Sequence, residues 1–364
     1  MERYGNPNYN NYSASTETKL LKYGNPNYNN REQSEQTCMD RYGVSNVAKL
    51  SDVMEKAMTN MISTNIEKYG VPYQTLRHFS TNSEYSSCNE ALLQKMADYG
   101  LQIDDREFIL GKYRYDFKIW NTLIEVDPFP YHNSTWHPYH EEPISKSYHK
   151  NKSDNATVSG YRCIHIFDWD NTDKILNLLA MKDTVYARKC SIKEIDKKQS
   201  FDFVNRYHLQ GDAKDKARVA LFLEGEMVSV MTFGKPRYNK NYEWELIRYC
   251  SSKKVIGGSQ KLFNYFVKKY KPNSMISYCD FSKFDGHTYR NLGFILKGVK
   301  ISKHWYNPKT GQHIFDSLLR QLGFDKLFGT NYGKGSSNRE LMIEHGFVEI
   351  YDAGQAKYII EKFE

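Results

Sequence analysis

Acidic residues interrupt two short runs of strand-forming residues near the middle of the chain. Asp116 lies within residues 113–119, and Glu125 and Asp127 lie in and just after residues 123–126. The two-residue period of a strand puts Glu125 and Asp127 on one side. Carboxylates on neighbouring strands repel one another unless a cation lies between them, and a hard divalent ion suits oxygen ligands. The pattern predicts that these three carboxylates hold Mg²⁺ or Mn²⁺, with solvent-facing acids on an edge hairpin as the alternative.

Two paired strands are needed to bring these acids together. Residues 113–119 alternate in polarity and are rich in aromatic and β-branched side chains, and residues 123–126 form a short apolar run. Asn121 and Thr122 between them are typical of a turn. The sequence therefore predicts a β-hairpin, with residues 101–110 as a loop or edge strand leading into it.

Histidines gather directly after this hairpin. Hydrolytic chemistry needs a proton donor or acceptor that titrates near neutral pH, and His132 and His149 are the candidates. His165 lies in an apolar run, which is typical of a core histidine. The pair His137 and His140 has a separation that could hold zinc, although the proline between them disfavours a regular helix.

The order of these motifs resembles a known family. Over residues 90–168 the chain is similar to the nuclease domain of very-short-patch-repair-type enzymes, a branch of the PD-(D/E)xK superfamily found in phage homing endonucleases. The resemblance places Asp116 on the family's strand aspartate and Glu125 and Asp127 on metal-side positions. The chain has Pro128 and Tyr131 where the family often has Gly and Trp, which leaves the role of Asp127 open. The catalytic residues that the resemblance implies are Glu90, Asp116, Glu125, His132, His149 and Lys152.

The length and composition of the chain limit the number of domains and the class of protein. A chain of 364 residues with 40% hydrophobic content is long enough for two or three packed domains. No apolar run reaches the length of a membrane span and the first residues are polar, so we expect no membrane association and a cytoplasmic location. The six cysteines include no C-x-x-C pair, which favours reduced thiols.

Charge is unevenly spread along the chain. The net charge is +8, and residues 1–80, 81–185 and 186–364 carry +1, −5 and +12. An acidic centre fits a metal site. A basic C-terminal half fits a polyanionic partner, because phosphates that are neutralised by protein release their counterions.

A short motif recurs in the first eighty residues. A basic residue followed by Tyr-Gly stands at residues 3–5, 22–24, 41–43 and 68–70. Each unit predicts a helix that ends at this motif, with the glycine as a left-handed cap. The units resemble the short DNA-binding repeats of phage homing endonucleases, and an asparagine-rich, partly disordered leader is the alternative. The resemblance implies phosphate contacts by Arg3, Lys22, Arg41 and Lys68.

Residues 190–300 carry a third pattern. A hairpin is predicted at 219–233 and strands at 244–250 and 274–278, and Gly257-Gly258-Ser259 opens an amphipathic helix between the two strands. This order resembles the N-acetyltransferase superfamily, in which the glycine-rich turn binds a cofactor pyrophosphate. No clear acid or base for acyl transfer stands out, so the resemblance is taken to imply a DNA-binding or structural use of the fold. The basic loop residues Lys235, Arg237 and Lys240 are suited to phosphate contact.

Together these patterns predict an α/β (α+β) protein with three parts. Residues 1–80 would be helical DNA-binding repeats, 81–185 a restriction-endonuclease-like nuclease domain, and 186–364 a basic mixed sheet resembling the N-acetyltransferase fold. The expected function is a metal-dependent, homing-type DNA endonuclease that acts on double-stranded DNA, with a homodimer possible. The alternatives are a catalytically inactive DNA-binding or regulatory protein and an acyltransferase.

Overall fold

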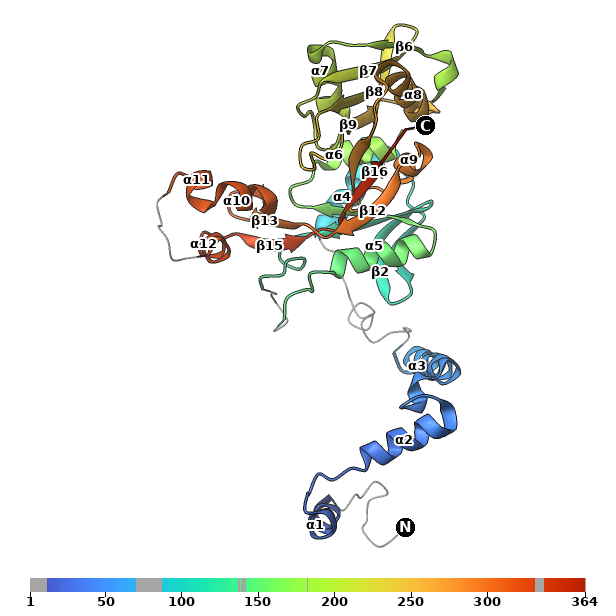
Figure 1. Ribbon diagram of the computed structural model, residues 1–364, viewed down its shortest axis with the longest axis vertical. Helices are drawn as coiled ribbons and strands as arrows, with labels where there is room; N and C mark the ends of the chain where they lie inside the picture. The colour runs from blue at the N-terminus through green and yellow to red at the C-terminus, as the bar shows by residue number, and fades with distance from the viewer. Residues whose placement is uncertain are drawn as a thin grey trace. The chain divides into compact units, whose positions relative to one another are not determined.

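The computed structural model describes residues 12–69, 87–136, 138, 142–181, 183–330 and 337–363 (Figure 1). The chain divides into two compact units, Met1–Asn82 and Ser83–Glu364. The second unit is mixed α/β with several sheets, as expected of the fold class. Along the described residues, no helix is both long and apolar enough to cross a lipid bilayer.

The first unit consists of helices. They are α1 (Tyr12–Tyr23), α2 (Arg31–Tyr42), the 3-10 helix η1 (Val47–Lys49) and α3 (Ser51–Tyr69). Gly24 and Gly43 follow α1 and α2 with φ angles of 68° and 70°. Their backbone N–H groups donate to Leu20 and Met39 at 2.9 Å. The predicted left-handed glycine caps are therefore confirmed for these two repeats, while Arg3 and Gly70 lie outside the described residues.

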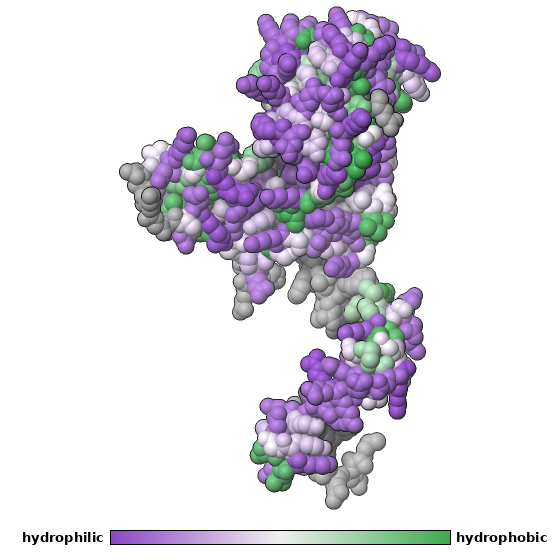
Figure 2. Space-filling view, in the orientation of Figure 1, coloured by the Kyte–Doolittle hydropathy of each residue, from purple (hydrophilic) through white to green (hydrophobic). Residues whose placement is uncertain are grey.

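These helices bury almost nothing. Among the side chains described between residues 14 and 68, Asn65 is the buried one. Apolar side chains such as Met54, Met58 and Ile66 are more than half exposed. Figure 2 shows pale and green residues on the surface of α3. A helix that leaves its apolar face in water depends on a partner or on local propensity for its stability.

The second unit begins with a four-stranded sheet in the order β1-β2-β3-β4. The first three strands are antiparallel, and β4 pairs parallel to β3 through the crossover helix α5. Helices α4 and α6 pack on one face through Leu92, Met96 and Leu176, and α5 packs on the other through Ala156. The bounds are α4 (Ser87–Asp98), β1 (Asp105–Leu110), β2 (Tyr113–Ile119), β3 (Thr122–Asp127), α5 (Tyr148–Val158), β4 (Arg162–Phe167) and α6 (Thr172–Leu179).

A seven-stranded sheet follows, in the order β12-β16-β11-β9-β8-β7-β6. Helix α8 packs on one face through Leu262, Phe263 and Phe266, and α7 packs on the opposite face through Phe203 and Val204. The elements of this part are β6 (Ser191–Glu194), α7 (Lys197–Tyr207), β7 (Ala217–Leu223), β8 (Glu226–Gly234), β9 (Trp244–Ser251), α8 (Gly258–Tyr270), β11 (Met275–Asp280), α9 (His287–Asn291), β12 (Ile295–Lys300) and β16 (Gln355–Ile360). A two-stranded parallel pair joins β5 (Thr184–Tyr186), before the 3-10 helix η3 (Ala187–Lys189), to β10 (Lys254–Ile256).

A three-stranded sheet, ordered β14-β13-β15, is inserted before the last strand. The sequence suggests that residues 348–360 form one strand-turn-strand unit, but β15 and β16 belong to different sheets because β16 pairs with β11 and β12. The insertion comprises β13 (Lys303–Asn307), β14 (Gln312–Phe315), α10 (Asp316–Leu322), α11 (Phe324–Phe328), α12 (Asn338–Glu344) and β15 (Val348–Tyr351).

Candidate functional site

Asp116 and Glu125 lie on neighbouring strands, as the hairpin predicts, but each already has its own partners. The Asp116 carboxylate accepts hydrogen bonds from Asn89 Nδ2 at 2.8 Å and from the backbone N–H of Val126 at 2.7 Å. Glu125 Oε2 lies 2.6 Å from Lys152 Nζ, and both side chains are about 95% or more buried. Glu125 is thus held by an ion pair at the sheet's α5 face.

Burial and the opposite charge of the partner act against each other in this ion pair. Desolvation raises the pKa of Glu125 well above its usual value, although Lys152 acts against it. The pKa of Lys152 is also raised, because Glu125 and Tyr148 outweigh the burial that would lower it. Lys152 therefore stays charged at neutral pH and needs the carboxylate beside it.

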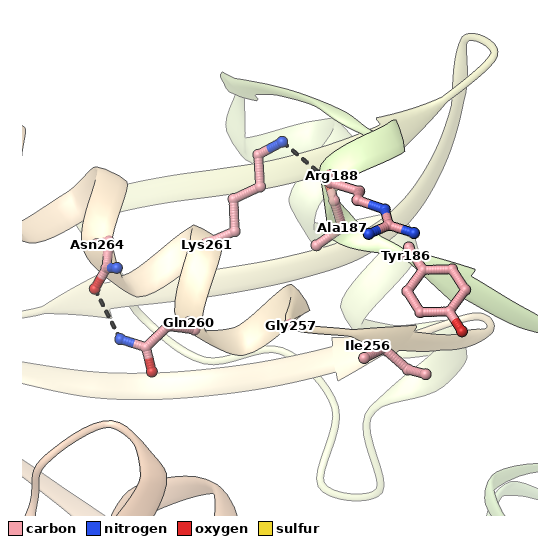
Figure 3. A pocket seen from close by; sticks show the side chains of 8 residues that line it. All are labelled: Tyr186, Ala187, Arg188, Ile256, Gly257, Gln260, Lys261 and Asn264. Carbon is pink, nitrogen blue, oxygen red and sulfur yellow. Dashed lines mark hydrogen bonds between the residues drawn. The ribbon is translucent and has the colours of Figure 1, made fainter.

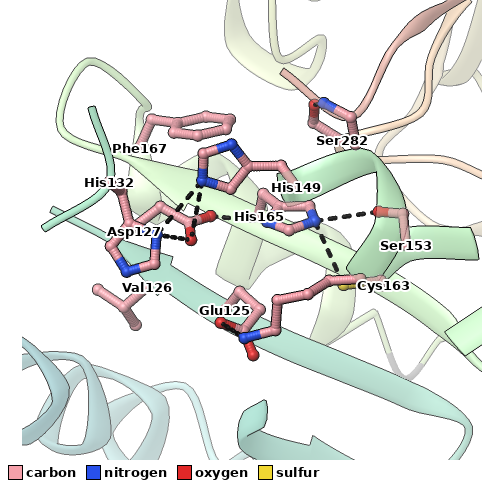
Figure 4. Close-up of polar contacts among 12 residues, drawn as sticks. Glu125, Val126, Asp127, His132, His149, Ser153, Cys163, His165, Phe167 and Ser282 are labelled. Atoms are coloured by element: carbon pink, nitrogen blue, oxygen red, sulfur yellow. Dashed lines mark hydrogen bonds and ion pairs between the residues drawn. The ribbon is translucent and has the colours of Figure 1, made fainter. Parts of the chain in front are cut away.

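Asp127 is surrounded by imidazoles (Figure 4). Its Oδ1 lies 2.8 Å from His132 Nδ1 and 3.5 Å from His149 Nε2, and its Oδ2 lies 2.7 Å from His165 Nδ1. Burial acts to raise the pKa of Asp127, but the three imidazoles hold it well below its usual range. Desolvation lowers the pKa of His165 to about 4, so this ring is neutral at pH 7 and donates Nδ1–H to the carboxylate.

The structure brings most of the predicted residues together. Five of them lie on β2, β3 and α5 and His132 lies in the segment after β3: Asp116, Glu125, Asp127, His132, His149 and Lys152. Glu90 does not join them, since its carboxylate pairs with Arg106 on β1. His165 is the member that local spacing misses, because it reaches Asp127 through the parallel pairing in which it stands opposite Glu125. His137 and His140, the zinc alternative, lie outside the described residues.

Some of the side chains predicted to contact phosphate are exposed, and at least one is already paired with a carboxylate of the protein. Lys22, Arg41 and Lys68 are exposed in the last turns of their helices. Arg237 is instead bound to the buried carboxylate of Glu245, with its Nε 2.8 Å and a terminal nitrogen 2.6 Å from Oε1. Its charge is therefore compensated within the protein.

A separate cavity of about 530 Å³ lies at the start of α8 (Figure 3). Gly257 caps the helix with φ 75° and offers no side chain to the free N–H groups of the first turn. On the other side, the Arg188 guanidinium lies 4.9 Å from the centre of the Tyr186 ring. Lys261 Nζ donates to the carbonyls of Ala187 and Cys190 at 2.9 and 2.6 Å, which fixes η3 against the helix. The N-terminus of α8 and the side chain of Arg188 therefore line the same cavity.

The seven-stranded sheet opens between β9 and β11. β9 and β11 are parallel neighbours, yet only Met275–Trp244 and Ile276–Glu245 are paired between them among the described residues. Both strands continue past these pairs, so their C-terminal parts diverge into a fork. Tyr278 lies on β11 two residues beyond the last pair, and its pKa is raised to about 12 by burial and by the charge of Glu245.

Several solved structures match this chain, and the three described below are acetyltransferases. No protein-family model and no curated protein matches the chain. Among solved structures, a Bacillus subtilis acetyltransferase in complex with CoA matches at 15% identity and a TM-score of 0.26, covering 48% of this chain and all of that one. The Escherichia coli ribosomal-protein-S18-alanine N-acetyltransferase matches at 13% identity and a TM-score of 0.26, covering 34% and 88%. An IAA acetyltransferase from Bacillus cereus matches at 12% identity and a TM-score of 0.27, covering 47% and 98%.

These matches correct the functional prediction. They fall on the C-terminal part that resembles acetyltransferases, and none is to a homing endonuclease or a very-short-patch-repair-like domain. The prediction that the chain is a DNA endonuclease hydrolysing phosphodiester bonds is therefore wrong, and the acyltransferase alternative fits better. At such low identities and TM-scores the matches assign no activity by themselves. The predicted metal and catalytic roles of the clustered carboxylates and histidines stay predictions.

Proposed function

We propose that the C-terminal part of this chain transfers an acyl group from a thioester of the coenzyme A type to an amine or hydroxyl acceptor. The observation that carries the proposal is the cavity at the start of α8. Along the chain, this helix comes between β9 and β11, the two strands of the fork. The matched Bacillus subtilis structure contains CoA, and a carrier of this kind combines a pyrophosphate with a long, narrow arm.

The cavity has the features that a pyrophosphate needs. The first N–H groups of α8 have no partner within the helix and point outward from a glycine cap. Backbone N–H groups at a helix N-terminus bind phosphate oxygens, and the helix dipole adds to the attraction. Arg188 supplies a full positive charge on the opposite wall. A side chain at residue 257 would project toward Ala187, whose Cβ lies 3.8 Å from that position.

The fork provides a place for the reacting end. In acyl transfer the acceptor atom bonds to the thioester carbon, the carbon–sulfur bond breaks, and the thiolate that leaves takes up a proton. Tyr278 carries its phenolic proton at neutral pH, as a tyrosine ordinarily does, and burial with the charge of Glu245 raises its pKa further, to about 12. It is therefore the candidate donor to the thiolate, while the acceptor releases its own proton to solvent. Glu245 is bound to Arg237, so it is not assigned as the base.

Calorimetric titration with acetyl-CoA tests the proposal. We expect binding to the wild-type protein and its loss in Gly257→Asp, because a carboxylate at the cap would occupy the same N–H groups and repel phosphate. Gly257→Asn has the same shape without the charge and serves as the matched control, so it should bind more tightly than the aspartate variant. Tyr278→Phe should keep binding and lower thiol release by about 10²-fold. No binding of wild type at millimolar coenzyme would overturn the proposal.

We also propose that the first unit contacts double-stranded DNA. Lys22, Arg41 and Lys68 each lie exposed in the last turn of a helix. The left-handed glycines after α1 and α2 end both helices in the same way, which repeats the placement of Lys22 and Arg41. Repeated, exposed cations of this kind suit the regular spacing of phosphates.

A further inference from the structure

Three ligand atoms converge where β3 ends. They are Asp127 Oδ1, His132 Nδ1 and His149 Nε2, and they all lie within 4.8 Å of one another (Figure 4). Asp127 comes from the end of β3, His132 from the segment that follows, and His149 from the first turn of α5. We propose that these three side chains bind a transition-metal ion, and that Zn²⁺ is the ion that suits them best.

The spacing of the three atoms fits one small ion. The oxygen lies 2.8 and 3.5 Å from the two nitrogens, and the nitrogens lie 3.3 Å from each other. Zinc bonds to histidine nitrogen and carboxylate oxygen are about 2.0–2.2 Å long and tetrahedral, so neighbouring ligand atoms lie about 3.3 Å apart. The observed triangle has this size, and the fourth corner of the tetrahedron remains for water.

The partners of these residues direct lone pairs toward the centre. His149 Nδ1 lies 2.6 Å from the carbonyl oxygen of Tyr351. A carbonyl only accepts, so Nδ1 carries the proton and Nε2 presents its lone pair to Asp127 and His132. Asp127 Oδ2 accepts from His165 Nδ1 at 2.7 Å, which leaves Oδ1 for the ion. A histidine held by a carbonyl and a carboxylate held by a histidine are the supports that metal ligands commonly have.

Without an ion, the cluster has too few protons for its three atoms. His132 Nδ1–H can donate to Asp127 Oδ1 at 2.8 Å. His149 Nε2 then presents its lone pair to the buried Asp127 Oδ1 at 3.5 Å and to His132 Nδ1 at 3.3 Å with no hydrogen of its own to share. One cation among the three atoms would satisfy all of them at once.

The ligand types select the class of metal. Two imidazoles and one carboxylate suit Zn²⁺ and its transition-metal neighbours, whereas Mg²⁺ prefers oxygen ligands. The set also differs from the predicted magnesium ligands, because Asp116 and Glu125 are engaged by Asn89, by Val126 and by Lys152. His132 is 17% exposed while the other two ligands are buried, so an ion would enter past His132.

The test compares metal binding by the full chain and by single variants after removal of metal with a chelator. We expect one Zn²⁺ per chain by calorimetry, and the intense visible absorption of tetrahedral Co²⁺ when cobalt replaces zinc. His132→Ala should weaken Zn²⁺ binding more than about 100-fold, and His165→Gln, which removes a supporting contact only, by about 10- to 100-fold. His287→Ala, an exposed histidine on α9, is the control and should bind as wild type does.

Three results would overturn the site. One is the absence of stoichiometric zinc binding by the wild-type chain. Another is unchanged zinc binding in His132→Ala, with circular dichroism confirming that this variant is folded. If Asp116→Asn abolished metal binding while His132→Ala did not, the ion would be held by the carboxylates instead, and the proposal would also fail.

Discussion

At the scale of single residues, the buried pair Glu125–Lys152 shows how local chemistry is fixed by packing. We predict that Glu125→Gln lowers the free energy of unfolding by about 3–5 kcal/mol, because it leaves a charged lysine buried without its partner. Urea unfolding followed by circular dichroism measures this. Adding Lys152→Met to the same protein should recover most of the loss.

A surface pair on the same helix provides the control. Lys150 and Asp154 form an ion pair one turn apart on α5, and both are partly exposed. Lys150→Ala should change the free energy of unfolding by no more than about 0.5 kcal/mol. Equal effects of Lys150→Ala and Glu125→Gln would show that burial does not govern the inner pair.

The second residue-scale prediction concerns pH. Burial, together with the charges of Arg248 and Lys174, lowers the pKa of His208 from 6.5 to about 3. The folded state therefore resists protonation, and the stabilisation is complete above pH 6.5 and is lost as pH falls toward 3. Between pH 6.5 and pH 3, protonation of His208 in the unfolded state should lower the free energy of unfolding by up to about 1.4 kcal/mol for each pH unit.

Unfolding midpoints between pH 7 and pH 4 test this. His208→Gln should flatten the pH dependence, while His287→Gln on the surface should leave it as it is in wild type. An identical slope in wild type and His208→Gln would contradict the assignment.

At the scale of elements, the sequence predicted local structure well. Residues 113–119 form the strand expected from their composition, and Gly24 and Gly43 cap their helices in the left-handed conformation that the repeated motif predicts. The rest depends on contacts between distant residues. His149 meets the carbonyl of Tyr351 across 202 positions, and His165 reaches Asp127 through the pairing of β3 with β4. Spacing along the chain carries no information about such contacts.

The start of α9 gives a prediction at this scale. A Cβ on Gly286 would lie 2.0 Å from the Tyr358 hydroxyl, and its φ is 76°. Gly293 has a similar φ of 85° but nothing within 4 Å. Both alanine variants meet the left-handed strain of about 1–2 kcal/mol, and only Gly286→Ala also forces Tyr358 aside, at about 1–3 kcal/mol more. Thermal unfolding of the two variants separates the backbone strain from the overlap with Tyr358. Equal losses of stability in the two variants would contradict this account.

At the scale of the whole molecule, the two units differ in how much hydrophobic core stabilises each of them. Every hydrophobic cluster found in the described residues lies between Leu92 and Phe363. We predict that a chain lacking residues 1–82 folds and unfolds cooperatively, with a thermal midpoint close to that of the full chain. Calorimetry measures this, and a large drop in the midpoint would mean that the first unit contributes to the core.

The same deletion tests DNA binding. Removing residues 1–82 should weaken binding to a DNA duplex and flatten the dependence of log K on log salt concentration, because phosphate contacts are lost. In the full chain, replacing Lys22, Arg41 and Lys68 together with alanine should lower that slope by about three. Fluorescence anisotropy over a salt series provides the readout, and an unchanged slope would place the contacts elsewhere.

The position of β16 has a consequence for how this protein is made. This strand follows nearly all the rest of the described chain, yet it lies between β11 and β12 inside the seven-stranded sheet. During synthesis, β11 ends 75 residues (355 − 280) and β12 ends 55 residues (355 − 300) before their shared neighbour begins, so each presents an unpaired edge to solvent in the meantime. A ribosome that stalls within this interval holds a nascent chain prone to pair with other chains, and the insertion of β13–β15 determines how long that interval lasts.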